Sequence, residues 1–448
     1  MTTEILNWLS YILKNRIGND IDLVFKVEQK IFIIGFTNSV FKILVDYDSQ
    51  LYKPSNDLQI FSRDIEWNIK EDKVNLVFLS SELFRDQPIV VTDENTVHIK
   101  YDCLGFIFWM LNRVEEYNFS DYNDVHSRFT AKDSILYKGK FYLRPVVDEW
   151  ITFIRNLFQC YSPKNNLIQY KYSFNLSHDV DRPFRYLYTK YYLFIWRAFK
   201  DLVKKRISFA YFLRINYYKI FRINKLSNID VYNNFDELID LSKVSSCSGI
   251  YFFMAGKSHK PTDPDYCLDN IEILKLAKKI ISSGNEIGLH PSYNTYNDFD
   301  KLQDEVNNFK TFFAKLGISS KLSSRMHYLR FKFPETLIDL EKIGVDTDET
   351  LGFSDTIGFR CGTSHDYYAF NLLQNETMKI KIRPLIAMQW TINSPSYMNL
   401  HLDDGFYQLE KIISEVKKHD GQFNYLIHND EYYELGIAFQ EKFVKIFD

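Results

Sequence analysis

The chain has few cysteines and no long apolar run, and both absences limit what it can be. Its five cysteines are scattered over 448 residues without a C-x-x-C pair, which is typical of reduced thiols in a cytoplasmic protein. No apolar run approaches the length of a membrane-spanning helix, and residues 1–17 lack the basic start and cleavage site of a secretory signal. The net charge of −3 gives no general attraction to nucleic acid. We therefore expect a cytoplasmic protein without a nucleic-acid partner.

The length favours two domains, each with its own core. In residues 1–150, the apolar pattern predicts strands over Val24–Phe36 and Asn75–Leu79 and a buried helix over Leu104–Tyr117. This layout indicates a small α/β domain of unknown role. The end of that helix carries the charged residues Arg113, Glu115 and Glu116. We expect them to form a structural ion-pair network, and the alternative is that they line the mouth of the second domain.

Residues 151–448 read as strands that alternate with helices. The expected strands are 172–176, 249–254, 286–289, 324–329, 345–348, 379–387 and 423–427. The expected helices are 234–243, 270–283, 299–316, 334–343 and 405–418. Such alternation argues for parallel βα units. About seven units predict an α/β fold with a distorted (β/α)7-type barrel, in which chemistry gathers at the carboxyl ends of the strands.

Two carboxylates stand where the first of these strands ends. Side chains alternate along an extended segment, so Asp179 and Asp181 point the same way. Neighbouring carboxylates repel each other unless a cation, a proton or solvent relieves them. The pair therefore indicates a metal site, a proton-transfer site or a solvated Asp-rich turn.

A histidine ends a second strand about a hundred residues later. His290 follows the buried run Ile287–Leu289, and Asn294 lies four residues further on, so one helical turn would aim both at one point. A lone histidine at a strand end is more often structural than a ligand. The Asp pair reverses that balance and favours a shared metal site.

Four segments together resemble the polysaccharide deacetylase superfamily, the NodB-homology or family-4 carbohydrate esterases. Ser177-His178-Asp179-Val180-Asp181 is similar to the D-x-D form of its first motif, and His290-Pro291-Ser292-Tyr293-Asn294 to H-(S/T)-x-x-H except at the last position. The third motif is matched through Arg325 alone. Tyr425-Leu426-Ile427-His428 resembles the closing strand that ends in histidine. The resemblance spans about residue 170 to the C-terminus, in a bacterial branch with an extra N-terminal α/β domain.

This resemblance implies roles for the matched residues. Asp181, His290 and Asn294 would bind a divalent metal, most simply zinc and otherwise cobalt, nickel or manganese. Asp179 would be the general base, oriented by Arg325, and His428 the general acid. An amide oxygen at Asn294 is a weaker ligand than the imidazole expected there. His327 lies on the same face as Arg325 and is the candidate replacement.

Three further residues are expected at the substrate: Asp348, Arg360 and His327. For Asp348 and Arg360, a structural salt bridge explains the sequence equally well. The function implied by the resemblance is metal-dependent removal of an N-acetyl group from a saccharide or its precursor in surface-glycan metabolism. The alternatives are a catalytically silent barrel that binds glycan and a hydrolase of small amides or imides.

An insertion at about 184–227 is dense in aromatic and basic residues. Such a stretch can form a helical lid over the barrel, which we favour. It can also lie on an anionic membrane surface, which would make a lipid-linked sugar a natural substrate and the protein membrane-associated.

Overall fold

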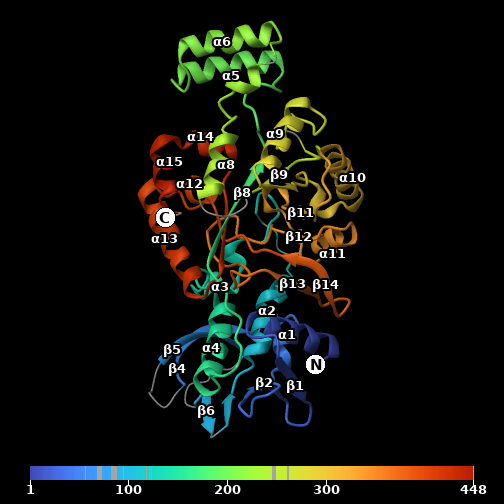
Figure 1. Ribbon diagram of the computed structural model, residues 1–448, viewed down its shortest axis with the longest axis vertical. Coiled ribbons are helices and arrows are strands. Elements are labelled where there is room, and N and C mark those ends of the chain that lie inside the picture. The colour runs from blue at the N-terminus through green and yellow to red at the C-terminus, as the bar shows by residue number, and fades with distance from the viewer. Residues whose placement is uncertain are drawn as a thin grey trace.

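The computed structural model describes residues 1–55, 57–67, 73–81, 88–93, 95–117, 119–120, 122, 124–223, 225–244, 249–259 and 262–446. These residues form a mixed α/β fold with three sheets, of five, nine and two strands (Figure 1). The α/β class predicted from the sequence is confirmed.

The N-terminal part begins with helix α1 (Thr3–Arg16), which buries an apolar stripe at i, i+1, i+4 and i+5 through Trp8, Leu9, Ile12 and Leu13. The five-stranded sheet has the order β1-β2-β3-β7-β6. Its strands are β1 (Ile21–Lys26), β2 (Ile31–Phe36), β3 (Lys42–Asp46), β6 (Val90–Asp93) and β7 (Thr96–Ile99). A separate hairpin pairs β4 (Gln59–Glu66) with β5 (Lys73–Ser80).

The expected single strand over Val24–Phe36 is wrong. It is the hairpin of β1 and β2, whose turn includes Lys30 at a positive φ of 51°. The expected helix over Leu104–Tyr117 is shorter, because α2 (Cys103–Leu111) stops before Arg113, which adopts φ 48°. A short 3-10 turn, Val114–Glu116, follows.

Buried ion pairs join this part to the rest of the chain. On α4 (Val146–Tyr161), Asp148 accepts hydrogen bonds from Arg16 at 2.9 Å and from the Ser364 backbone at 2.8 Å. Arg113 and Arg360 both bind Glu116, at 2.7 and 2.6 Å. The ion-pair network expected around Arg113 is therefore present, and it fixes the two parts of the chain against each other.

The nine-stranded sheet has the order β13-β14-β12-β11-β10-β9-β8-β16-β15. All its neighbours are parallel except β13 and β14. Its strands are β8 (Ser173–Val180), β9 (Ile250–Phe253), β10 (Glu286–Leu289), β11 (Ser323–Ser324), β12 (Thr347–Asp348), β13 (Tyr367–Asn371), β14 (Glu376–Ile382), β15 (Ala387–Met388) and β16 (Gln422–Leu426). Each of the seven predicted strands overlaps a parallel strand of this sheet, but β11 and β12 are shorter than predicted, and β13 was not predicted.

A closed barrel is not confirmed. Within the described residues, the sheet ends at β13 on one side and at β15 on the other. One backbone hydrogen bond, from Leu385 to Leu351, links the segment between β14 and β15 to the residues after β12, whereas the bond from Ile386 to Asn424 extends the pairing of β15 with β16. The expected strand 379–387 is divided between β14 and β15, which allows the chain to cross the opening between the two edges.

The five helices that the sequence predicts are present as α8 (Phe235–Val244), α9 (Ile271–Ser282), α10 (Phe299–Leu316), α11 (Glu335–Lys342) and α13 (Leu402–Lys418). Three further helices among the described residues were not predicted, namely α12 (Gln389–Asn393), α14 (Asn429–Glu434) and α15 (Gly436–Val444). On α10, Leu302, Val306, Phe309 and Phe313 make one buried face. The Asp298 side chain caps its start, and Gly317 ends it at φ 72°.

The insertion forms a helical hairpin of α5 (Tyr191–Val203) and α6 (Phe209–Ile220), followed by the short α7 (Leu226–Ile229). Figure 1 shows α5 and α6 beyond the rest of the molecule, at the end opposite the five-stranded sheet. None of the described helices is long and apolar enough to cross a bilayer.

Candidate metal centre

The candidate site lies at the carboxyl ends of four strands of the nine-stranded sheet. Asp179 is near the end of β8 and Asp181 follows it directly. His290 follows β10, His327 comes shortly after β11, and His428 comes after β16. Parallel strands present their carboxyl ends at one edge, so residues far apart in the sequence meet there.

Asp181, His290 and His327 form the group best suited to hold a cation. One carboxylate oxygen of Asp181 lies 3.3 Å from Nε2 of His290, and the other lies 3.4 Å from Nε2 of His327. The ligand atoms of all three residues lie within 4.8 Å of one another. Two imidazoles and a carboxylate are compatible with a divalent metal.

Both imidazoles are oriented from behind. Nδ1 of His290 lies 2.5 Å from the Arg325 carbonyl oxygen, which can only accept a hydrogen bond, so His290 donates from Nδ1 and turns Nε2 toward the carboxylates of Asp179 and Asp181. Nδ1 of His327 lies 3.2 Å from Asp263. Metal-binding histidines in proteins are held by such acceptors on their second nitrogen.

The Asp263 carboxylate is itself fixed. It accepts backbone hydrogen bonds from Ser258 at 2.6 Å, from His259 at 2.5 Å and from Tyr293 at 3.0 Å. These donors hold the carboxylate in the position from which it orients His327.

The electrostatics also favour a cation. Burial alone would raise the pKa of Asp181, but the charge of His327 holds it well below 3.8. Burial would lower the pKa of His327, but the charges of Asp181 and Asp263 raise it to about 9. Asp181 Oδ1 and His290 Nε2 are both buried without a hydrogen-bond partner, although they face each other. A buried carboxylate oxygen and a buried imidazole nitrogen that face each other in this way fit a shared metal ion.

Asp179 stands beside this group and is held by Arg325. Its Oδ1 lies 3.0 Å from Arg325, and its Oδ2 lies 3.6 Å from Nε2 of His290. Arg325 is fully buried, pairs with Glu349 at 3.1 Å and stacks on the ring of Phe252. The contact between Arg325 and Asp179 is the one that the motif resemblance implies.

His428 also lies beside Asp181. Its Nε2 is 3.8 Å from Asp181, and its Nδ1 is 3.4 Å from Glu431. Burial would lower the pKa of His428, but the hydrogen bond to Glu431 and the charge of Asp181 raise it to about 10. His428 is therefore protonated at neutral pH in this arrangement.

The local path of the chain explains how His327 reaches the site. The expected strand 324–329 ends at Ser324, and His327–Leu329 form a 3-10 turn. Tyr328 and Leu329 adopt φ values of 62° and 54°, which non-glycine residues rarely do. The His327 imidazole lies against Asp181 in this turn. The sequence indicates His327 as a candidate ligand for another reason, because a strand with His327 and Arg325 on one face is expected there.

The expected metal ligand Asn294 is engaged elsewhere. Its amide nitrogen donates to the Ser258 carbonyl at 3.1 Å, and its oxygen accepts from Arg330 at 3.2 Å. A guanidinium on that oxygen opposes binding of a second cation. In this structure His327, and not Asn294, supplies the second side chain beside Asp181 and His290.

Asp348 and Arg360, expected at the substrate, are not brought into the site. Asp348 accepts hydrogen bonds from Thr350, and its burial raises its pKa to about 6. Arg360 pairs with Glu116 and donates to the Gly352 carbonyl. Arg360 thus forms the structural salt bridge that the sequence left open as an alternative, whereas the contacts of Asp348 within the described residues are hydrogen bonds.

A cavity of about 380 Å³ opens onto Asp179, Asp181, His327 and His428. Aromatic side chains form part of its wall, namely Tyr328, Trp390 and Tyr397. His126 and Arg128 also line it, and both come from the first 150 residues. The cavity therefore combines the charged group with apolar ring faces and with residues from the N-terminal part.

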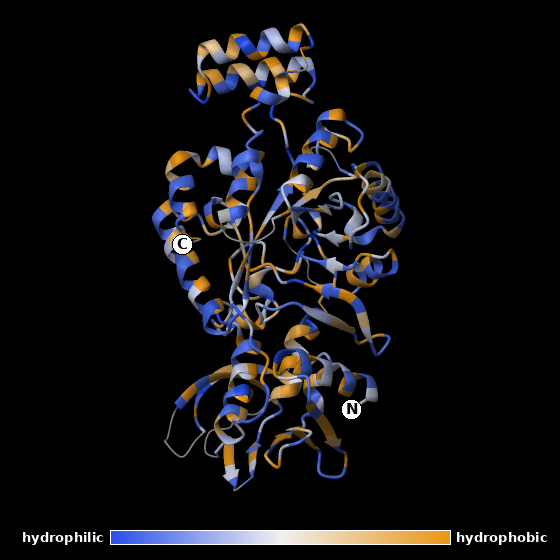
Figure 2. Cartoon of the chain, viewed as in Figure 1, coloured by the Kyte–Doolittle hydropathy of each residue, from blue (hydrophilic) through white to orange (hydrophobic). Residues whose placement is uncertain are grey.

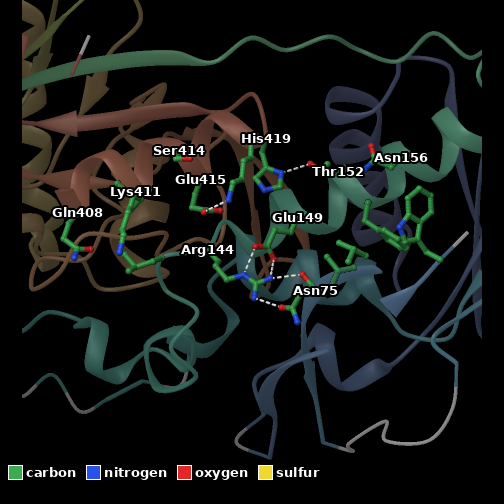
Figure 3. A pocket seen from close by; sticks show the side chains of 17 residues that line it. Asn75, Arg144, Glu149, Thr152, Asn156, Gln408, Lys411, Ser414, Glu415 and His419 are labelled. Carbon is green, nitrogen blue, oxygen red and sulfur yellow. Dashed lines mark hydrogen bonds and ion pairs between the residues drawn. The ribbon is translucent and has the colours of Figure 1, made fainter. Parts of the chain in front are cut away.

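A larger cavity, of about 760 Å³, lies away from these residues, between β5, α4 and α13 (Figure 3). Four charged side chains on its wall form two ion pairs, Arg144 with Glu149 at 2.7 Å and Lys418 with Glu415 at 2.6 Å. The single group of possible metal ligands found among the described residues is the one at Asp181. The smaller cavity is therefore the candidate site.

Comparison with known proteins places part of the chain. Residues 1–163 match DUF7033, a family of unknown function. No curated protein matches the chain. Among solved structures, a "putative polysaccharide deacetylase from Mycobacterium smegmatis" aligns with 62% of this chain and 84% of its own, at 11% identity and a TM-score of 0.39. Neither fold nor function is inferred from so distant a likeness.

Sequence reasoning did not identify Asp263 and Glu431, the acceptors behind His327 and His428. Asp263 lies in a loop after β9, without a motif around it. Glu431 lies three residues after His428, at the start of α14. That i, i+3 spacing could have indicated it, because residues three apart on a helical turn are neighbours.

Proposed function

We propose that the protein is a metal-dependent hydrolase that removes an N-acetyl group from a saccharide or saccharide precursor. The observation that supports this most is the convergence of Asp181, His290 and His327, with Asp179 and His428 beside them. The motif order, which resembles the polysaccharide deacetylases, agrees with the proposal.

Asp181, His290 and His327 would hold the metal. A bound zinc ion, or cobalt, nickel or manganese, would polarise the acetamide carbonyl and lower the pKa of a water molecule. The protein's own residues then have to orient the acetamide, accept one proton and donate another.

Asp179 is the base in this proposal. Arg325 donates a hydrogen bond to the carboxylate at 3.0 Å and aims it at the site. It takes a proton from water as the oxygen adds to the acetamide carbon. Arg325 acts only through Asp179 and is a positioning residue.

His428 is the acid. Its raised pKa keeps the proton that an amine leaving group needs, and Glu431 holds the ring from the opposite side. When the C–N bond breaks, the proton passes from His428 to the nitrogen. The products are acetate and the free amine of the sugar.

The cavity supports a saccharide over a small imide. Trp390 is 52% exposed on its wall, beside Tyr397. Exposed ring faces beside a polar centre suit a sugar, which offers an apolar face and polar edges.

The test is release of acetate from N-acetylglucosamine oligomers by the zinc-loaded protein. We expect one acetate for each free amine, and a loss of at least a hundredfold in Asp179→Asn with zinc retained. Asp240→Asn, an exposed carboxylate on α8, is the matched control and should stay active. A zinc-loaded wild type that releases no acetate from any N-acetylated saccharide would contradict the proposal.

A further inference from the structure

The hairpin of α5 and α6 has a small core of its own. Six buried residues form it: Tyr186, Phe194, Ala198, Ile207, Ile215 and Leu226. Polar contacts tie its base together, since Asp201 binds Arg185 at 2.5 Å and the Tyr186 hydroxyl at 2.7 Å. The hairpin is therefore a packed unit, and its outer surface is the surface of two folded helices.

Each helix also carries a second apolar stripe that faces solvent. On α5, Tyr192, Trp196, Phe199 and Val203 are all more than half exposed. On α6, the same is true of Phe209, Leu213, Tyr217 and Ile220. The spacing in each set is that of a single helix face. Figure 2 shows hydrophobic residues along both helices, at the far end of the molecule from the N-terminal sheet.

This apolar surface is unusual in a folded chain. Single exposed apolar side chains are normal, but a set of eight on two adjacent helices marks an interaction site. The described lining of the 380 Å³ cavity includes no residue of 184–227. The hairpin therefore does not act as the expected lid in this structure.

The same segment concentrates positive charge. Residues 184–227 contain eleven Lys and Arg and a single acid, Asp201, so their formal charge is 11 − 1 = +10. The whole chain carries −3, so the other residues carry −3 − 10 = −13. Asp201 is already paired inside the hairpin. Within the described residues, Arg185 and Arg206 are the only two of the eleven basic side chains that form ion pairs with carboxylates.

We propose that this hairpin docks onto the surface of an anionic lipid bilayer. Tryptophan and tyrosine favour the bilayer interface, and Lys and Arg near it are drawn to anionic headgroups. Helices with exposed aromatic and basic residues lie in the interface plane without spanning it. The docking does not depend on the proposed hydrolase reaction.

Two other partners fit less well. A second copy of the hairpin would bring together two surfaces of charge +10, which repel each other. A nucleic acid would neutralise the charge but would leave aliphatic side chains such as Leu213 and Val203 uncovered. A bilayer satisfies both the charge and the apolar stripes.

The experiment is cosedimentation of the full chain with vesicles of phosphatidylcholine containing phosphatidylglycerol, against pure phosphatidylcholine. We expect binding to the anionic vesicles alone, with loss at high salt. Lys204→Gln with Lys205→Gln should weaken binding roughly 30-fold, from about 1 kcal/mol for each basic residue near an anionic surface. Trp196→Ser with Phe199→Ser, and separately Phe209→Ser with Leu213→Ser, remove exposed apolar side chains of α5 and of α6, and at least one pair should abolish binding.

Leu373→Ser with Ile437→Ser is the matched control, because both residues are exposed apolar side chains outside the hairpin. This variant should bind vesicles like the wild type. A blue shift of tryptophan fluorescence on binding, absent in Trp196→Phe, would report insertion of that ring without any change of fold.

The proposal is overturned if the folded wild type does not bind anionic vesicles, or binds neutral ones equally. It is also overturned if both serine pairs leave binding unchanged. A concentration-dependent dimer that these pairs dissolve, or tight binding to nucleic acid without vesicle binding, would assign the hairpin to another partner.

Discussion

Replacing His327 should remove most of the protein's zinc affinity, whereas replacing Asn294 should not. His327 Nε2 lies 3.4 Å from Asp181 and its Nδ1 is held by Asp263, but the Asn294 amide is occupied by Ser258 and Arg330. Four-ligand zinc sites bind with about 10–16 kcal/mol, or about 3 kcal/mol for each ligand. Loss of one ligand therefore corresponds to roughly a hundredfold in Kd.

The assay is competition for zinc against a fluorescent chelator, with His327→Gln and Asn294→Ala measured beside the wild type. We expect Kd to rise about a hundredfold in His327→Gln and less than threefold in Asn294→Ala. Circular dichroism of the metal-free proteins controls for folding, because His327 is also paired between two carboxylates. The reverse order of the two effects would refute the assignment of His327 to the metal.

Three further predictions concern other residues. Burial would raise the pKa of Asp148, but Arg16 and neighbouring hydrogen bonds lower it to about 2. About 2 kcal/mol of folding stability is therefore present above pH 4 and is lost as the pH falls toward 2. Urea unfolding of Asp148→Asn should show lower stability at pH 7 and a weaker dependence of stability on acid pH, and an unchanged dependence would contradict this. His428→Gln should lower kcat by about 10²–10⁴ with zinc still bound, and unaltered turnover would remove it as the acid. Trp390→Ala should raise KM about fivefold, from about 1 kcal/mol of lost apolar contact, with little change in kcat; an unchanged KM would mean that the sugar does not stack there.

The sequence was informative wherever a local pattern fixes the structure. Strand β10 and helix α10 occupy the residues that their apolar periodicity predicts. Asp179, Asp181 and His290 are brought together because each ends a parallel strand, a position that the pattern also defines. Arg325 reaches Asp179 for the same reason.

The sequence was uninformative where tertiary contacts decide. Strand alternation named His327 as a candidate ligand but could not foresee that His327–Leu329 form a 3-10 turn, with Tyr328 at positive φ, and not a continued strand. Nor could the motif spacing show that Arg330 would bind the Asn294 oxygen. Barrel closure likewise depends on where Leu385 and Ile386 bond, not on a periodicity of either segment.

The most direct test of the metal centre is a crystal of the zinc-loaded protein measured on both sides of the zinc absorption edge. The account predicts one anomalous peak, about 2.0–2.2 Å from Asp181, from Nε2 of His290 and from Nε2 of His327. A peak bound by Asn294, or one in the larger cavity between α4 and α13, would contradict it.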